Sequence, residues 1–491
     1  MSRACCPPLD FAPLAFVAWL PLLLALRRTS VLRGTLLGFL QGAVTNILAF
    51  CWMVEPARDV GGLSSPASIG AFLLLCLWQG SRVGLMCLAY RSVVVEVAWI
   101  RPIAFAGLLA LSESVFPMVF PWGSYGFVHA APIWAQLASL GGAGLVTASI
   151  GLVNEAVAVA IDAPRGKRAR TAWGALAGVG LLTAYGAWRM HLVDADVFSA
   201  IRSKVLVVQG NLRPARLEQR DPAAVYRERT LRSLAAHPEI DWIVWPETAI
   251  FYTTEAPKLA EFFRDVLLRD RRHGITAPRI DRPLVTGLVI EEGTARFNSV
   301  VAADASGSLT GRYDKRLLVP LGETRALGEG EPQFAAKLGE NPEPLMVGAH
   351  PIGAFVCFEA LDSNRVQAAM AEGRAELLLN PTSDAWFAGS IGPRMHLAFA
   401  KVRAIEHARY LLRPTTTGVT ALIDPVGRQA WALPEGRDIA GITEIAWMKP
   451  ITSFTRHGAA ATTLFAAVLS LICAAIGVAR RKRRSSAPVD S

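Results

Sequence analysis

The chain has 491 residues, of which 52% are apolar and only 18% are Asp, Glu, Lys or Arg. A soluble domain averages about 25% charged residues, so this composition excludes a wholly water-soluble protein and indicates a membrane protein. The seven cysteines include no CxxC pair, which excludes a dense disulfide framework and a zinc site of that spacing. The net charge of +10 leaves an anionic surface or a nucleic acid open as partners until the charges are located.

Apolar segments approach the length of about 20 residues that a bilayer span needs. We expect seven spans, at 11–26, 34–54, 67–90, 95–112, 133–161, 171–188 and 457–479. The first is expected to be an anchor and not a cleaved signal peptide, because Arg27 and Arg28 follow it and no small-x-small cleavage site appears. The glycine-rich run at 141–144 predicts close helix packing in preference to a phosphate loop.

Basic residues mark the inside-facing ends of these spans. They cluster at 27–33, 165–170 and 480–484, whereas 113–132 contains neither Lys nor Arg. The pattern predicts that the N-terminus and residues 189–456 lie outside, in the periplasm of a bacterial inner membrane. We therefore divide the chain into a six-span bundle (1–188), an outer domain (189–456) and a last span with a basic cytoplasmic tail (457–491).

Residues 189–456 predict an α/β domain, since short β-rich runs alternate with helix-like segments. The domain carries 33 Lys and Arg against 32 Asp and Glu, so it is nearly neutral and is not predicted to bind nucleic acid. The expected helices are 221–236, 257–272, 362–373 and 394–409. The expected strands are 204–209, 242–245, 284–290, 299–303, 354–357, 376–379 and 420–423.

Cys357 is the only cysteine of the outer domain. A lone thiol is most often a small buried hydrophobe, but this one is expected to end a strand where a helix begins. At such a turn nearby backbone N–H groups are expected to lower the thiol pKa and to receive an oxyanion. His396 and His407 lie in no motif that indicates a catalytic partner for the thiol, so both are expected to be structural.

Two other segments provide better partners for a thiol nucleophile, which needs a base and a positive charge. Glu247 follows a strand and a proline, and Lys315 lies in Tyr313-Asp314-Lys315. Each alone is typical of a solvated loop residue. The hypothesis depends on all three residues together.

These segments resemble the nitrilase (carbon–nitrogen hydrolase) superfamily, whose triad is Glu, Lys and Cys in that chain order. The resemblance implies an α-β-β-α sandwich, and Asn298-Ser299 is similar to the superfamily's N-S before the lysine strand. Spans on both sides narrow the resemblance to the apolipoprotein N-acyltransferases. Further similar segments are 208–211, 319–323, 383–387, 390–393, 403–406, 416–420 and Phe120-Pro121-Trp122.

The resemblance implies acyl transfer from a phospholipid to the α-amine of a diacylglyceryl-cysteine lipoprotein through a cysteine thioester. Glu247 is expected to be the general base, Cys357 the nucleophile and Lys315 the oxyanion partner. No metal or cofactor is expected, and the protein is expected to be a membrane-embedded monomer. The expected supporting residues are Glu323, Glu359, Phe358 and Asn298, and those for substrate access are Phe120, Trp122 and Trp386.

The sequence departs from the family's pattern at Phe358 (often Tyr), at Thr324 (Tyr in G-E-Y-V-P) and near 216–220, where a Trp is common. The family also begins with one more span, so a truncated or late start is expected. These departures bear on substrate preference more than on the triad. Three alternatives stay open: a membrane-tethered amidase with water as acceptor, a transporter with an accessory outer domain, and a non-catalytic paralogue.

Overall fold

The structure is a computed structural model that describes residues 12–59, 61–93, 99–124, 132–212, 221–255, 258–264, 279–293, 295–320, 323, 344–370, 374–387 and 389–485. The chain forms two compact units. The first comprises residues 1–55, 63–190 and 457–491, and the second comprises residues 56–62 and 191–456. Thr324 and residues 216–220 lie outside the described residues.

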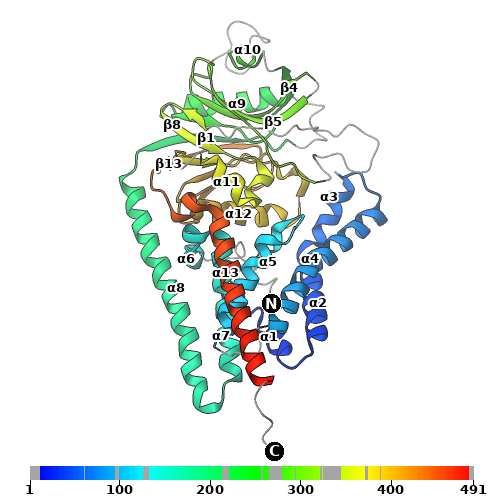
Figure 1. Cartoon of the computed structure of the whole chain (residues 1–491). Helices are drawn as coiled ribbons and strands as arrows, with labels where there is room; N and C mark the ends of the chain where they lie inside the picture. Colours follow the sequence, from blue (N-terminus) through cyan, green and yellow to red (C-terminus); the bar gives the residue numbers. More distant parts are fainter. Residues whose placement is uncertain are drawn as a thin grey trace, which may run out of the picture. The chain divides into compact units, whose positions relative to one another are not determined.

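The first unit is helical (Figure 1). Helices α2 and α4 pack side by side, as do α5 and α7. A short 3-10 helix, η2 (Ala12–Phe16), precedes α1. Another, η4 (Pro121–Gly123), contains the last two residues of the Phe120-Pro121-Trp122 segment. Its helices are α1 (Leu20–Leu26), α2 (Val31–Phe50), α4 (Ser65–Val93), α5 (Arg101–Val115), α6 (Pro132–Ala135), α7 (Ala138–Asp162), α8 (Arg165–Ser199, which continues into the second unit) and α13 (Ser453–Ser485, which begins there); η3 (Cys51–Met53) and α3 (Val54–Asp59) connect α2 to α4.

Four described helices are long and apolar enough to cross a membrane: Val31–Asp59, Ser65–Ser92, Ala138–Asp162 and Ser453–Arg480. They coincide with the second, third, fifth and seventh expected spans. The first expected span contains only short helices. The fourth overlaps α5, which has 15 residues and is therefore shorter than a full span. The sixth lies within α8, which has 35 residues but is not among the four. The total of seven spans therefore stays a prediction.

The glycine run at 141–144 bends α7. Gly142 has φ +66°, a backbone conformation that residues with a side chain rarely adopt. A Cβ on Gly141 would lie 2.6 Å from Thr462 Oγ1, and that hydroxyl donates to Gly141 O at 2.8 Å. The predicted close packing is therefore present, between α7 and α13.

The second unit contains two sheets. The first sheet has the order β13-β1-β2-β4-β5-β6, with β3 also paired to β4; the second has the order β12-β11-β10-β9-β8-β7. The strands of the first are β1 (Arg202–Gln209), β2 (Trp242–Val244), β3 (Ile250–Glu255), β4 (Leu284–Glu292), β5 (Ala295–Ala303), β6 (Leu309–Asp314) and β13 (Ile439–Ala446). Those of the second are β7 (Leu345–Val347), β8 (His350–Ala354), β9 (Leu377–Leu379), β10 (Leu411–Arg413), β11 (Ala421–Ile423) and β12 (Gln429–Ala432).

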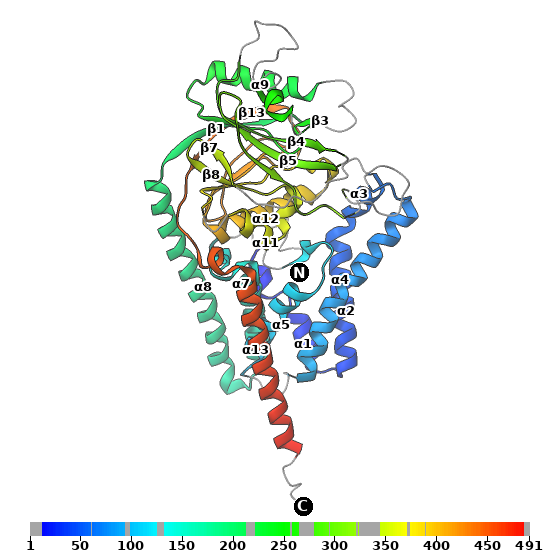
Figure 2. The same ribbon diagram turned by 45° about the horizontal axis from the view of Figure 1, so that its top comes forward.

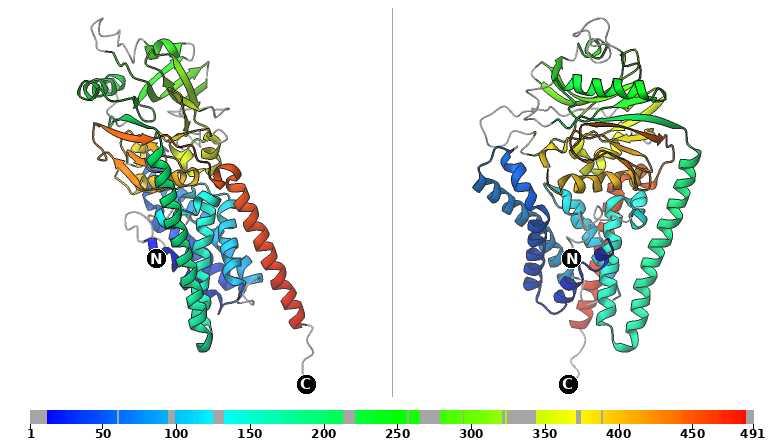
Figure 3. Two further views of the ribbon diagram at one scale, coloured as in Figure 1. Left: turned by 90° about the vertical axis from the view of Figure 1, so that its left-hand side faces the viewer. Right: turned by 180° about the vertical axis from the view of Figure 1, so that it is seen from behind.

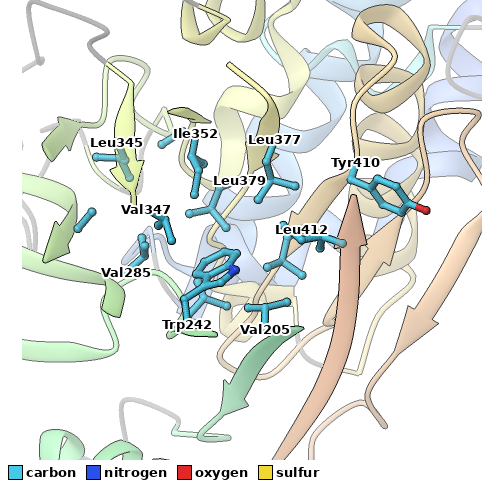
Figure 4. Packing of buried hydrophobic residues seen from close by; sticks show 14 of the residues in the cluster. Val205, Trp242, Val285, Leu345, Val347, Ile352, Leu377, Leu379, Tyr410 and Leu412 are labelled. Carbon is cyan, nitrogen blue, oxygen red and sulfur yellow. The ribbon is translucent and has the colours of Figure 1, made fainter. Parts of the chain in front are cut away.

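Apolar side chains from both sheets fill the space between them. Val205 and Trp242 of the first sheet pack in one buried cluster with Ile352, Leu379 and Leu412 of the second (Figure 4). Residues of β1 and β2 alternate, so that Leu206 and Ile243 enter a separate cluster on the outer side. Alternation at period 2 thus lets each central strand bury both of its faces.

Helices cover the two outer faces. Helix α9 (Pro222–Ala236) packs on the first sheet, whereas α11 (Ser363–Ala369) and α12 (Gly392–His407) pack on the second (Figures 2 and 3). The short α10 (Leu259–Glu261) belongs to the expected helix 257–272, most of which lies outside the described residues. The layering agrees with the α-β-β-α arrangement that the resemblance implies. Six strands (β3, β6, β7, β10, β12 and β13) were not predicted.

Candidate functional site

The three expected triad residues follow strands of the second unit. Glu247 comes three residues after β2, and Lys315 comes directly after β6. Cys357 begins a short 3-10 helix, η10 (Cys357–Leu361), because β8 already ends at Ala354. The expectation that the strand continues to Cys357 was therefore wrong. All three side chains are buried, and exposure does not exceed 7% for any of them.

Glu247 accepts hydrogen bonds on both carboxylate oxygens. Its Oε1 accepts from Asn298 Nδ2 at 2.8 Å and from Lys315 Nζ at 3.1 Å. Its Oε2 accepts from the backbone N–H of Ser383 at 2.7 Å. The Glu247 carboxylate is therefore held by three donors from three different segments of the chain.

The loop of Glu247 lies close against β4. A Cβ on Gly287 would lie 2.6 Å from Pro246 O and 2.7 Å from Glu247 Cα, so only glycine fits there. The next residue, Thr248, has φ +45°. The loop is therefore held in an unfavourable conformation by its contacts with the sheet.

Lys315 lies between two carboxylates. Its Nζ is 2.8 Å from Glu323 Oε1 as well as 3.1 Å from Glu247 Oε1. Burial by itself lowers the pKa of Lys315, but the two carboxylates raise it well above its ordinary value. Glu323 is held in turn by the N–H of Val319, at 2.8 Å from its Oε2. The lysine is therefore a fixed positive charge.

Cys357 has a strained backbone and a protonated thiol. Its φ is +50°, in the left-handed region that non-glycine residues seldom occupy. Burial raises the pKa of the Cys357 thiol well above its ordinary value; Glu247 raises it further, and Lys315 opposes this. The expectation of a lowered pKa was wrong, chiefly because burial disfavours the thiolate, and also because the surrounding carboxylates outnumber the lysine. The Cys357 N–H is also engaged, since it donates to Pro381 O at 2.9 Å.

Glu359 ties the cysteine loop to the lysine loop. Its Oε1 accepts from the N–H groups of Arg316 and Leu317, at 2.6 and 3.0 Å. Its Oε2 accepts from the N–H of Val356 at 2.6 Å and from Tyr313 OH at 2.9 Å. Burial raises the pKa of Glu359 to about 7, although these donors oppose the shift. With four donors on two oxygens, Glu359 acts as a clamp and has no free position for a thiol proton.

The remaining predicted residues lie in both units. Phe358 is buried beside Cys357, and Trp386 is half-buried in a short helix, η12 (Asp384–Phe387). In the helical unit, Trp122 is buried and contacts Trp52, with ring centroids 5.1 Å apart. The N–H of Phe120 donates to Gln79 Oε1 at 3.2 Å. The access role of these residues stays a prediction.

Sequence reasoning missed several contributors to the site. His396 was expected to be structural, yet its Nε2 lies 3.0 Å from Cys357 O. Ser383 and Asp384 were noted only as part of a family-like segment. That segment was the available signal, but only the structure shows what each residue contacts. Within the described ranges, no group of three or more His, Cys, Asp or Glu side chains is arranged to hold a metal ion.

Comparison with known proteins identifies the family. The carbon-nitrogen hydrolase family matches residues 205–446, and the apolipoprotein N-acyltransferase N-terminal domain matches residues 2–156. Among solved structures, a carbon-nitrogen hydrolase from Helicobacter pylori G27 is 16% identical and covers 50% of this chain and 90% of its own, with a TM-score of 0.38.

Two relatives match over most of their length. An apolipoprotein N-acyltransferase of Pseudomonas syringae pv. tomato is 30% identical over 87% of this chain and 85% of its own. One of Azotobacter vinelandii is 31% identical over 91% of this chain and 88% of its own. The chain therefore belongs to the apolipoprotein N-acyltransferase family.

Proposed function

We propose that this protein moves a fatty acyl chain from a membrane phospholipid to the N-terminal α-amine of a diacylglyceryl-cysteine lipoprotein. Membership of the family supports the activity, and the four long apolar helices support a membrane location. The observation that carries the chemistry is the buried Glu247–Lys315–Glu323 cluster, whose charges act on the Cys357 thiol. No step of this chemistry requires a metal or a cofactor.

Glu247 is the general base in this proposal. An ionised carboxylate offers about four acceptor positions, and the three hydrogen bonds described above occupy three of those on Glu247. Among the described residues no second donor occupies Oε2, so a position on that oxygen can take the Cys357 proton. The raised thiol pKa makes such a base necessary, because little thiolate forms without one.

The first half-reaction forms a thioester. The Cys357 sulfur bonds to the ester carbonyl carbon of the phospholipid while Glu247 takes the thiol proton. Lys315 stabilises the tetrahedral oxyanion. The carbon–oxygen bond then breaks, Glu247 returns the proton to the leaving alkoxide, and a lysophospholipid departs.

The second half-reaction forms an amide. The neutral α-amine of the lipoprotein bonds to the thioester carbonyl, and Glu247 accepts a proton from its nitrogen. The carbon–sulfur bond breaks, and the proton goes to the Cys357 thiolate. Asn298 and Glu323 hold the two charged groups in place through both steps, and Glu359 and Phe358 hold the cysteine loop.

The same proposal includes the topology predicted from the basic residues. Seven spans place residues 1–188 and 457–491 in and beside a bacterial inner membrane, with residues 189–456 as a periplasmic catalytic domain. Phe120, Trp122 and Trp386 serve substrate access, and the protein acts as a monomer. Both substrates are lipids, so a membrane-anchored domain receives their reacting groups at the bilayer surface.

Trapping the acyl-enzyme tests the chemistry. The full-length protein is incubated with a phospholipid carrying a labelled acyl chain, and the label is mapped by peptide mass spectrometry. We expect a hydroxylamine-sensitive label on Cys357 that moves to the amine when a diacylglyceryl-cysteine peptide is added. Label that persists in Cys357→Ala contradicts the proposal, and release of free fatty acid with no amide product supports an amidase instead.

A further inference from the structure

Three buried side chains beside the cysteine loop have no role in the proposed chemistry. His396 and Asp384 are each 1% exposed, and Arg413 is fully buried. They come from three different elements: α12, η12 and β10. Polar groups so deeply buried are costly unless they are paired, so their contacts matter.

The contacts form a chain that ends on the nucleophile's own backbone. Arg413 Nη2 lies 3.1 and 2.9 Å from the two oxygens of Asp384, and 3.1 Å from His396 Nδ1. The same Nδ1 lies 3.2 Å from Asp384 Oδ1. The other nitrogen of the ring, Nε2, lies 3.0 Å from Cys357 O.

The Cys357 carbonyl assigns the ring tautomer. A carbonyl oxygen only accepts hydrogen bonds, so Nε2 carries the proton of a neutral ring, and Nδ1 is then an acceptor for Arg413. That proton is then directed at Cys357 O. Burial lowers the pKa of His396, which agrees with a neutral ring.

The carbonyl of Cys357 needs such a donor because the residue is strained. A non-glycine residue at φ +50° keeps that conformation only when its surroundings hold it. Its N–H is held by Pro381 O at 2.9 Å. On the carbonyl side, Asn380 Nδ2 lies 3.4 Å away and is closer, at 3.0 Å, to Phe355 O. His396 therefore makes the shorter hydrogen bond to this carbonyl.

We propose that His396 is a positioning residue for the nucleophile, with Arg413, which Asp384 holds in place, donating to its Nδ1. By fixing the Cys357 carbonyl, His396 fixes the backbone dihedrals from which the Cα–Cβ bond projects, and so aims the sulfur at the substrate carbonyl. His396 transfers no proton in this role. The role rests on the proposed function, because it requires Cys357 to be the nucleophile.

Two substitutions of equal polarity separate this role from packing. In His396→Gln the amide nitrogen takes the place of Nε2, whereas in His396→Asn it takes the place of Nδ1 and falls short of Cys357. The full-length variants are compared for the single-turnover rate of thioester formation, normalised to the folded fraction, over a range of phospholipid concentrations. His407 provides the matched control: it is equally buried on the same helix, and its Nδ1 lies 2.9 Å from Thr455 Oγ1.

We expect His396→Gln to stay within about threefold of the parent protein. His396→Asn should lose about 10- to 100-fold in the acylation rate with an unchanged half-saturating phospholipid concentration, because a misaimed nucleophile slows chemistry and not binding. The His407→Gln and His407→Asn variants should not differ in this rate. Equal rates for the two position-396 variants, or an equal loss at position 407, overturn the proposal.

A second comparison tests the positioning role even if His396→Asn fails to fold. Arg413→Lys keeps a cation beside Asp384 but loses the planar fork that donates to Nδ1, so it should also slow acylation without changing the phospholipid dependence. An unchanged rate in that variant overturns the proposal. Cys357→Ala in the same assay separates the two ideas. Thioester in Cys357→Ala contradicts the proposed function, whereas its absence, with all 396 and 413 variants at the parent rate, contradicts only the positioning role.

Discussion

Both units of this chain bury an ion pair, and the two pairs differ in what surrounds them. In the helical unit, Arg27 joins the end of α1 to α7 through Glu155, at 2.7 Å, and through Asp162. In the α/β unit, Lys315 joins Glu247 and Glu323 beside a thiol. Buried pairs as such are poor indicators of function. In the proposed reaction, two features set the second cluster apart: the thiol beside it, and a Glu247 oxygen with one position that no donor among the described residues occupies.

The largest expected effect is at the thiol. Cys357→Ser should reduce acyl transfer by more than about 10⁴-fold, because loss of the nucleophile removes the covalent route. Amide product is measured by mass spectrometry of a diacylglyceryl-cysteine peptide. Cys87→Ser, at a buried thiol of the helical unit, is the control and should retain the parent activity. Substantial activity in Cys357→Ser would contradict the thioester route.

Exchanging Glu for Gln in each cluster compares the two directly. Glu247→Gln should lower acyl transfer by about 100-fold or more, because the general base is lost. It should also raise the alkylation rate of Cys357 by iodoacetamide, because the Glu247 charge raises the thiol pKa. Glu155→Gln should change neither rate per folded molecule. A loss of turnover in Glu247→Gln without faster alkylation would contradict the electrostatic account.

The thiol pKa predicts the pH dependence of alkylation. Since the thiol pKa lies well above its ordinary value of 9.0 in the folded protein, alkylation of Cys357 should rise about tenfold per pH unit from 7 to 9 without a plateau. The sign for stability follows: above pH 9 the unfolded chain releases this proton first, so the free energy of unfolding falls as the pH rises. Peptide mapping distinguishes Cys357 from the other cysteines. A plateau below pH 8 would contradict the raised pKa.

Glu359→Gln tests the clamp between the loops. In the parent protein the donors share the two carboxylate oxygens of Glu359, whereas Gln offers only one oxygen. At least one buried N–H therefore loses its acceptor. We expect a loss of about 1–3 kcal/mol in the free energy of unfolding and a slower acylation step. Denaturant melts and single-turnover assays measure the two effects. Glu291→Gln, whose partner Arg296 is partly exposed, should cost much less, with a median near 0–1 kcal/mol for such pairs.

The smallest effect on catalysis is expected in the helical unit. Glu155→Gln weakens the link to Arg27, which keeps Asp162 and Ala158 O as acceptors, so about 1–3 kcal/mol of stability should be lost. Thermal unfolding in detergent measures the loss, and acyl transfer per folded molecule should be unchanged. A fall in turnover without a fall in stability would show that this pair, too, contributes to the reaction.

Much of the architecture could be predicted from the sequence because it depends on local pattern. Long apolar runs indicated the four helices that are apolar enough to span a membrane, and short β-rich runs indicated β1, β2 and β4. The helices α9 and α12 were predicted within two residues of their bounds. The three-residue strands β7 and β10 were missed, although the equally short β2 and β9 were expected, because so short a strand is defined mainly by its pairing with neighbours.

The candidate site divides in the same way. Glu247, Lys315 and Cys357 stood out by residue type and by resemblance, so the sequence alone could nominate them. The direction of the Cys357 pKa, the engaged Cys357 N–H and the contact with His396 needed the tertiary structure. Each depends on groups that lie far apart in the chain and meet only when two sheets and α12 pack together. Burial and the balance of neighbouring charges are properties of that packing, and no single segment contains them.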